Sequence, residues 1–241
     1  MRKLLAILIC FVPVGMLRIF LYRWLLGYKI PYAAKIAPFN FILAKECVLG
    51  NVNIGYLNYF NVDKLQLDDG VRVVRFNRFK LLSSLHVGKN TNFLVGNVAF
   101  GTRTGVSPFK EYEALSFGDS CVVTNRHIFD LSESINIGND VTIGGEGSQF
   151  WTHGFDLDHV KIQAGIKIGD RVYVGSRSMI LQGVAITDNV SIGAGTVVSK
   201  SLNESGFYVS SNLISKGNPK LYDSSSSLVV HNGFKFVRKE P

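Results

Sequence analysis

The sequence of 241 residues contains little cysteine and little proline, and its apolar runs are short. The three cysteines, Cys10, Cys47 and Cys121, are widely spaced, and their odd number excludes a disulfide framework and a four-thiolate zinc site. We therefore expect a reducing compartment. The uncharged run at residues 4–17 is too short to cross a bilayer core about 30 Å thick, which requires about 20 helical residues.

Acidic residues are absent from the first 45 positions, although the whole chain carries a formal net charge of +8. The rest of the chain holds 19 basic and 18 acidic residues, so it is nearly neutral. A nearly neutral body disfavours nucleic-acid binding, which requires a basic surface that neutralises phosphates. The basic residues of the N-terminal segment are Arg2, Lys3, Arg18, Arg23, Lys29, Lys35 and Lys45.

Residues 1–40 contain two apolar stretches, in the second of which Arg18 and Arg23 lie among aromatic and aliphatic side chains. This pattern predicts a pair of helices in the membrane interface, with the cations toward the lipid headgroups. A helical cap on the following domain and a cleaved signal peptide are the alternatives. The basic start resembles a signal peptide, but no small-x-small cleavage site follows and the apolar character continues to Leu26.

Aliphatic residues recur at intervals of six between residues 162 and 198. On an α-helix, six residues advance by about 600°, so these positions would form no apolar face. On β-strands side chains alternate, so every sixth residue points to the same side. The pattern therefore predicts short strands stacked into a solenoid with an aliphatic interior. The ladder consists of Ile162, Ile168, Val174, Ile180, Ile186, Ile192 and Val198.

Residues 135–220 resemble the hexapeptide-repeat acyltransferases in the segments INIGNDVTIGGEGS, IGDRVYVGSRSMILQGVAITDNVSIGAGTVVSK and KGNPK. They are most similar to sugar acetyltransferases of bacterial polysaccharide gene clusters. The resemblance implies an all-β fold, a left-handed parallel β-helix, and a homotrimer with active sites between adjacent chains. Upstream fragments such as VLGNVNIGY look like degenerate coils. We therefore expect the β-helix to span residues 41–215, followed by a C-terminal tail at residues 216–241.

The ladder shifts frame between Ile143 and Ile162, which are 19 residues apart, one more than three hexapeptides. We expect residues 149–161 to leave the solenoid as a loop, and loops on rigid scaffolds often carry function. In the family, a histidine at the base of such a loop removes a proton from the acceptor, and His153 is the matching residue. Imidazole suits this role because it titrates near neutral pH.

Several residues near His153 are candidates for supporting roles. Asp156 or Asp158 is expected to orient the second ring nitrogen, with Asp156 preferred, and His159 is the rival base. Trp151 is a candidate contact for the acceptor. His127 precedes His153 by 26 residues, so it should not stack directly beneath it; it either binds the acceptor across a trimer interface or has a structural role.

The resemblance also implies a binding site for acetyl-coenzyme A along the ladder. A backbone N–H near Gly175 or Ser176 would stabilise the oxyanion, and lysines would contact the phosphates. Turn geometry is the alternative explanation for the glycine and alanine positions. The implied donor-site residues are Gly175, Ser176, Ala194, Ser199, Lys200, Lys216 and Lys220.

The sequence therefore predicts an acetyltransferase that moves an acetyl group from acetyl-coenzyme A to a hydroxyl of a bacterial surface polysaccharide or its lipid-linked precursor. An amino-sugar N-acetyltransferase and a non-catalytic β-helix scaffold are the alternatives. A carbonic anhydrase of the same fold requires three histidine ligands for zinc, and the third is not evident, so no metal is expected. We expect a cytoplasmic enzyme that is peripheral at the inner face of the cytoplasmic membrane.

Overall fold

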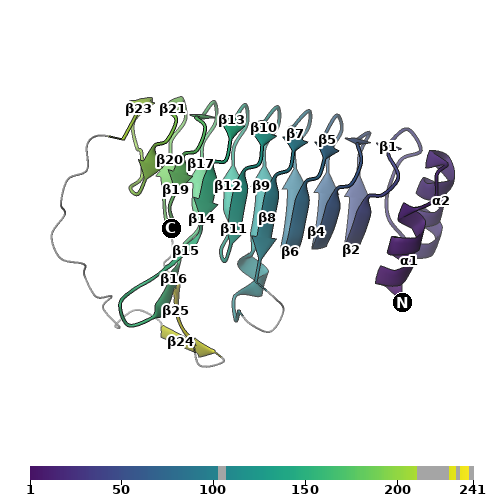
Figure 1. Cartoon of the computed structure of the whole chain (residues 1–241), viewed down its shortest axis with the longest axis horizontal. Coiled ribbons are helices and arrows are strands. Elements are labelled where there is room, and N and C mark those ends of the chain that lie inside the picture. The colour runs from purple at the N-terminus through teal and green to yellow at the C-terminus, as the bar shows by residue number, and fades with distance from the viewer. Residues whose placement is uncertain (103–106, 211–227, 232–233, 239–241) are drawn as a thin grey trace.

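The computed structural model describes residues 1–102, 107–210, 228–231 and 234–238. Short parallel strands stack into a β-solenoid of about eight turns, and two helices lie at its N-terminal end (Figure 1). Each turn contributes strands to three faces, and the chain bends sharply at the corners between them. Alternate side chains of each strand then point into the interior. The predicted solenoid is confirmed.

The first face is a parallel sheet of nine strands. In spatial order it contains β1 (Lys35–Ile36), β3 (Asn53–Ile54), β5 (Arg72–Arg75), β7 (Asn92–Val95), β10 (Val122–Asn125), β13 (Thr142–Glu146), β18 (Tyr173–Val174), β21 (Val190–Ile192) and β23 (Gly206–Tyr208).

The second and third faces are joined through long strands near the N-terminal end. Strand β6 pairs with β8 through its first half and with β9 through its second half, so it spans both faces. The long strands are β2 (Phe41–Leu49), β4 (Tyr59–Leu67) and β6 (Arg78–Val87). The second face continues with β8 (Val98–Gly101), β11 (Ile128–Leu131), β14 (Gln149–Trp151), β19 (Met179–Ile180) and β22 (Val197–Val198). The third face continues with β9 (Ala114–Phe117), β12 (Ile135–Ile137), β17 (Ile166–Ile168) and β20 (Ala185–Ile186).

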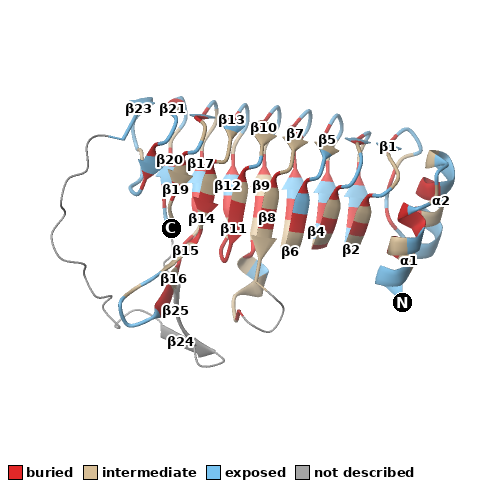
Figure 2. Ribbon diagram, viewed as in Figure 1, coloured by how far each residue is buried: buried red, intermediate tan, exposed pale blue. Residues whose placement is uncertain are grey.

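Buried residues follow the strands of the solenoid (Figure 2). These inward-facing residues change from aromatic to aliphatic along the chain. In the upstream turns, buried phenylalanines contact one another from turn to turn, with ring centroids 4.7–5.8 Å apart. Downstream, Ile and Val occupy the same inward positions, as the ladder predicted. The aromatic series consists of Phe60, Phe79, Phe93, Phe117, Phe129 and Phe150.

One predicted ladder position is wrong. Ile162 lies in a hairpin outside the solenoid and is only partly buried, whereas Phe150 and Ile168 face the interior. Strands β15 (His153–Phe155) and β16 (Val160–Gln163) form this antiparallel hairpin. Residues 149–151, expected to be part of the loop, instead form β14 and pair with β11 and β19. The excursion therefore begins after Trp151, at the corner between the second and third faces.

A second excursion leaves the same corner earlier in the chain. It connects β8 to β9 and contains the short 3-10 helix η1 (Lys110–Tyr112). Both excursions project from the same side of the solenoid, and the turn formed by β11 and β12 lies between them (Figure 1). Two C-terminal strands, β24 (Leu228–His231) and β25 (Phe234–Arg238), extend the hairpin sheet, because β25 pairs in parallel with β16.

The helices α1 (Arg2–Cys10) and α2 (Gly15–Leu26) cover the open end of the solenoid. Pro13 lies between them, and Gly27 ends α2 with a left-handed φ of 64°. Ile9, Ile19 and Tyr22 join the hydrophobic core, so one face of the helix pair packs as a cap. In the described part of the chain, neither helix is long and apolar enough to cross a membrane.

Candidate active site

His153 begins the hairpin strand β15 and makes its closest polar contact with a residue of the preceding turn. Its Nδ1 lies 2.6 Å from Oδ1 of Asp130, which is in β11. The Asp130 side chain is 6% exposed and that of His153 is 22% exposed. A carboxylate at this distance holds the proton on Nδ1, so Nε2 of the neutral ring is left as the proton acceptor.

The main chain around this pair is held by Thr152. Its hydroxyl donates to the carbonyl of Asp130 at 2.9 Å and accepts the backbone N–H of Glu133 at 3.0 Å. These bonds link the base of the hairpin to the corner of the preceding turn. The position of His153 relative to Asp130 is therefore set by buried hydrogen bonds between two turns rather than by the hairpin alone.

A buried lysine extends the polar network. The ammonium of Lys161 donates to Oγ of Ser132 at 2.7 Å, and Ser132 Oγ lies 3.1 Å from Nδ1 of His153. His153 and Gln163 are cross-strand partners, as are Phe155 and Lys161, so all four share one face of the hairpin. That face points toward Asp130 and Ser132.

Two ionisable side chains of this network have shifted pKa values. Burial lowers the pKa of Lys161, while the carboxylates of Asp130 and Glu113 counteract the shift. Burial raises the pKa of Glu113 to about 7, although Lys110 donates a hydrogen bond to it. Glu113 follows η1, so the site joins residues of both excursions through one buried cation.

Asp156 does not orient His153, which corrects the prediction. Its Oδ1 accepts the backbone N–H groups of Asp158 at 3.0 Å and Val160 at 2.8 Å, and so stabilises the turn of the hairpin. Asp158 is exposed, and the rival base His159 is exposed in the same turn with a φ of 59°. The turn thus uses these residues for local geometry.

Two aromatic rings lie near the His153 ring. The centroid of Trp151 is 6.3 Å away and that of Phe155 is 5.7 Å away, both in edge-to-face arrangements. Trp151 is partly buried, and its indole N–H donates to Gln149 at 2.9 Å. The structure thus brings the predicted acceptor residue Trp151 next to His153.

His127 has a structural position within the solenoid. It is completely buried, its Nδ1 accepts the N–H of Ser148 at 3.1 Å, and its Nε2 lies 3.0 Å from the hydroxyl of Thr124. Burial lowers its pKa to about 4, so the ring is neutral at physiological pH. These contacts favour the structural role, and a contact between His127 and the acceptor stays a prediction.

The predicted donor residues lie on two edges of the second face. Gly175, Ser176 and Ala194 lie at the corner between the first and second faces, whereas Ser199 and Lys200 lie at the corner that also carries the hairpin. Ala194, Ser199 and Lys200 are exposed. Lys216 and Lys220 are outside the described residues.

Gly175 and Ser176 have packing roles of their own. A Cβ at residue 175 would lie 2.6 Å from the backbone nitrogen of Ala194, so only glycine allows the next turn to approach. The hydroxyl of Ser176 accepts the N–H of Glu146 at 2.9 Å. Turn geometry therefore accounts for these two residues in the isolated chain.

Sequence reasoning missed Asp130, Ser132 and Lys161. The feature that would have located them is the pairing of Ile128 with Gln149. This pairing places Asp130 beside Trp151 and hence beside the base of the hairpin. That pairing depends on a turn length of 21 residues, which a strict six-residue frame does not contain. Within the described residues, no three His, Cys, Asp or Glu side chains form a group suited to a metal ion.

Comparison with known proteins agrees with this geometry. Residues 158–200 match the family model described as bacterial transferase hexapeptide (six repeats). The protein is thus a hexapeptide-repeat β-solenoid, and the predicted resemblance to this transferase family is confirmed.

Among solved structures, the chain is similar to a maltose O-acetyltransferase from Clostridium difficile 630, with 21% identity and a TM-score of 0.32. The match covers 55% of this chain and 66% of that one, just under two thirds of its length.

Proposed function

We propose that this protein transfers an acetyl group from acetyl-coenzyme A to a sugar hydroxyl, with His153 as the general base. The observation that carries the proposal is the 2.6 Å contact between His153 and the buried Asp130, where a hairpin interrupts hexapeptide repeats. A histidine held in one tautomer by a carboxylate is an arrangement that activates hydroxyl nucleophiles. The proposed catalytic unit is the domain that the sequence predicts over residues 41–215.

In this reaction, Nε2 of His153 takes the proton of the acceptor hydroxyl while its oxygen attacks the thioester carbonyl. The carbon–sulfur bond then breaks, and the leaving thiolate takes the proton from Nε2, giving an acetyl ester and free coenzyme A. Asp130 is the positioning residue that stabilises the imidazolium formed between these steps. A positioned base contributes about 10²–10⁴-fold to such a reaction.

Direct transfer is favoured over an acyl-enzyme intermediate. The three cysteines of the chain are buried, and burial raises the pKa of the Cys47 and Cys121 thiols. A neutral, buried thiol is a poor nucleophile. The exposed Ala194, Ser199 and Lys200 offer accessible backbone and one cation for the coenzyme's amides and phosphates.

A homotrimer would complete the site. In one chain, the His153 corner and the Gly175–Ser176 corner are opposite edges of the second face. A neighbouring solenoid packed beside this face would bring its own edge against His153 and form a groove between two chains. Light scattering of the purified protein tests this part, and a monomeric mass would contradict it.

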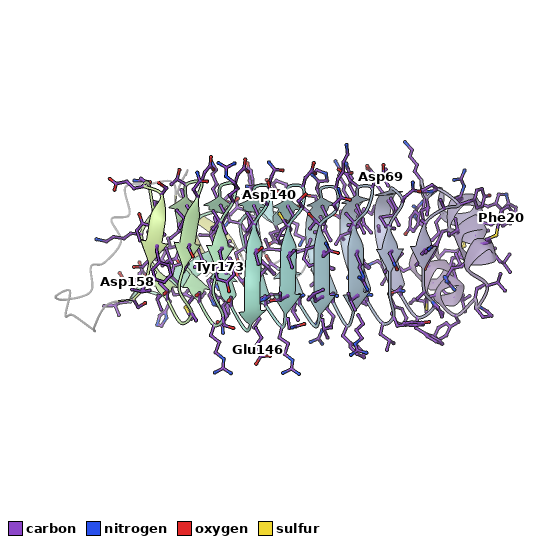
Figure 3. All side chains as sticks on the ribbon, turned by 90° about the horizontal axis from the view of Figure 1, so that it is seen from above. Phe20, Asp69, Asp140, Glu146, Asp158 and Tyr173 are labelled. Atoms are coloured by element: carbon purple, nitrogen blue, oxygen red, sulfur yellow. The ribbon has the colours of Figure 1, made fainter. Side chains whose placement is uncertain are left out.

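The N-terminal cap supports a peripheral position at the inner face of the cytoplasmic membrane. Its outer surface exposes Leu4, Leu8, Phe20 and Trp24, and Trp24 is 72% exposed. In Figure 3, Phe20 lies at the helical end of the molecule and Asp158 of the hairpin lies toward the other end. Helices with an exposed apolar surface and no acidic residue suit the interface of an anionic membrane. This position favours a surface glycan or its lipid-linked precursor as acceptor.

The test compares surface glycans from cells that carry wild-type protein or His153→Ala. We expect the wild type to add one acetyl group per modified sugar by mass spectrometry, and the variant to add none. Mild alkali removes an O-acetyl ester but leaves an amide, so the same sample distinguishes a hydroxyl from an amino-sugar acceptor. Unchanged acetylation in the variant would favour the non-catalytic scaffold.

A further inference from the structure

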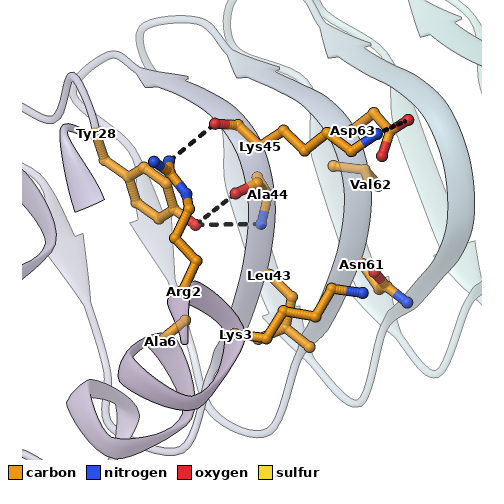
Figure 4. Close-up of a pocket in the computed structure, with 10 residues that line it drawn as sticks. All are labelled: Arg2, Lys3, Ala6, Tyr28, Leu43, Ala44, Lys45, Asn61, Val62 and Asp63. Carbon is orange, nitrogen blue, oxygen red and sulfur yellow. Dashed lines mark hydrogen bonds and ion pairs between the residues drawn. The ribbon is translucent and has the colours of Figure 1, made fainter.

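A small cavity lies between the first turn of α1 and strands β2 and β4 (Figure 4). Its volume is about 120 Å³, several times the ~30 Å³ that a water molecule takes in the liquid. Arg2 and Lys3 line it from the helix, and Lys45, Asn61 and Asp63 line it from the strands. The cavity therefore has room for a phosphate group among polar side chains.

The charges around the cavity do not balance. Asp63 carries the one carboxylate among the residues that line the cavity, and its Oδ2 lies 2.9 Å from Nζ of Lys45. The guanidinium of Arg2 is held by neutral partners, the carbonyls of Leu26 at 2.8 Å and Lys45 at 2.9 Å. Three cations and one carboxylate leave an excess of two positive charges beside a fixed guanidinium, which suits an anion with several oxygen atoms.

The helix that lines the cavity also carries exposed apolar side chains, as does α2. Leu4 and Leu8 follow Arg2 and Lys3 on α1 and are 61% and 59% exposed. On α2, the rings of Phe20 and Trp24 stack with centroids 6.2 Å apart and are also exposed. A soluble anion would use the cations alone, whereas a phospholipid uses both features: its phosphate meets the cations and its acyl chains meet the apolar side chains.

We propose that the cavity lined by Arg2, Lys3 and Lys45 binds the phosphate of an anionic phospholipid headgroup and fixes how the solenoid stands on the membrane. The inference rests on the membrane position proposed above and adds a defined site to it. Without such a site, the cations would attract the membrane only through their summed charge, and their exact positions would not matter.

The test uses the full chain and two variants with the same change in net charge. Lys3→Gln/Lys45→Gln alters the cavity, and Lys29→Gln/Lys35→Gln removes two exposed cations of the same end that lie outside it. Binding is measured by co-sedimentation with phosphatidylcholine vesicles that contain phosphatidylglycerol. We expect the cavity variant to lose about tenfold more affinity than the control variant.

Equal losses in the two variants would overturn the headgroup site but leave the membrane position intact. No binding by the wild type to these vesicles would overturn both. Nuclear magnetic resonance of the Asn61 side-chain amide, titrated with a short-chain phosphatidylglycerol or with inorganic phosphate, separates the sources of the anion. We expect the lipid to shift this signal at lower concentration, and an equal response to phosphate would contradict a lipid ligand.

Discussion

At the residue scale, the chemistry proposed here depends on a carboxylate that the sequence places far from the histidine. Asp130 lies 23 residues before His153 but contacts its Nδ1, whereas the nearer Asp156 is used by the hairpin turn. The two residues have the same side chain but different roles, because Asp130 is buried between turns and Asp156 accepts hydrogen bonds within the hairpin turn. This difference gives a matched pair of substitutions.

We predict that Asp130→Asn lowers kcat by about 100-fold or more, because an amide stabilises neither the required tautomer nor the imidazolium. The measurement is coenzyme A release with a saturating acceptor. Asp156→Asn is the control and should retain most of the activity, since an asparagine oxygen can still accept the two backbone N–H groups. The reverse ranking would restore Asp156 as the orienting residue.

A second residue-scale prediction concerns Glu113, whose pKa is raised by burial to about 7. The folded state therefore keeps a proton that the unfolded chain releases above about pH 4.5, so stability falls as pH rises from there to about 7. We expect the ionisation of Glu113 to lower the free energy of unfolding by about 2–3 kcal/mol across that pH range. Urea unfolding of wild type and Glu113→Gln at both ends of the window measures it, and parallel pH profiles would contradict it.

At the element scale, the corner between the first and second faces carries a ladder of buried polar side chains. Each asparagine accepts the backbone N–H of its counterpart in the next turn at 2.9–3.1 Å. The turns between these residues are 18, 19 and 20 residues long, so the ladder persists although the turn length varies. The ladder contains Asn40, Asn58, Asn77 and Asn97, followed by His127 and Ser148.

His127 continues this ladder with an imidazole, which gives an element-scale prediction. Its pKa of about 4 lies below the ordinary 6.5, so its contribution to stability is complete above pH 6.5 and is lost as pH falls toward 4. His127→Asn keeps an acceptor for the N–H of Ser148. We expect its free energy of unfolding to fall by about 2–3 kcal/mol less than that of the wild type between pH 7 and pH 4. Thermal unfolding between pH 4 and 7 checks this, and equal acid sensitivity would contradict it.

At the scale of the whole molecule, the solenoid separates the cap from the candidate active site. Five strand spacings on the second face lie between β2 and β14, and at about 4.8 Å each they place the hairpin about 24 Å from the first turn. With the cap on a membrane, His153 would face glycan units well above the surface. An acceptor with several sugars between the lipid and the modified residue fits this height better than a single lipid-linked sugar.

The two faces of the cap give a prediction at this scale. We expect Ile19→Ala, which alters the buried face, to lower the free energy of unfolding by about 2–5 kcal/mol. The double change Phe20→Ser/Trp24→Ser alters only the exposed face, so it should leave the melting temperature nearly unchanged while reducing vesicle binding. Calorimetry and co-sedimentation on the same samples measure both effects, and a large loss of stability in the double variant would mean that this face is covered in the native protein.

The sequence by itself determined the repeat, because side-chain alternation makes a six-residue period meaningful only on strands. Ile168, Val174 and Ile180 were therefore assigned to the interior correctly, and the residue with the right chemistry for a base, His153, was found at a break in the pattern. The upstream turns were harder to recognise since Phe60, Phe79 and Phe93 replace aliphatic residues and the turn lengths vary.

Only the tertiary structure decided which residues surround His153. Ile162 keeps the six-residue spacing by coincidence, because it lies in the hairpin. The six-residue frame therefore did not reveal the strand pairing that brings Asp130 to His153. The physical reason is that contacts between turns depend on the exact length of every corner, and corners are where insertions occur. A periodic sequence specifies what faces inward, but the neighbours of a residue at a corner are fixed only when the turns are stacked.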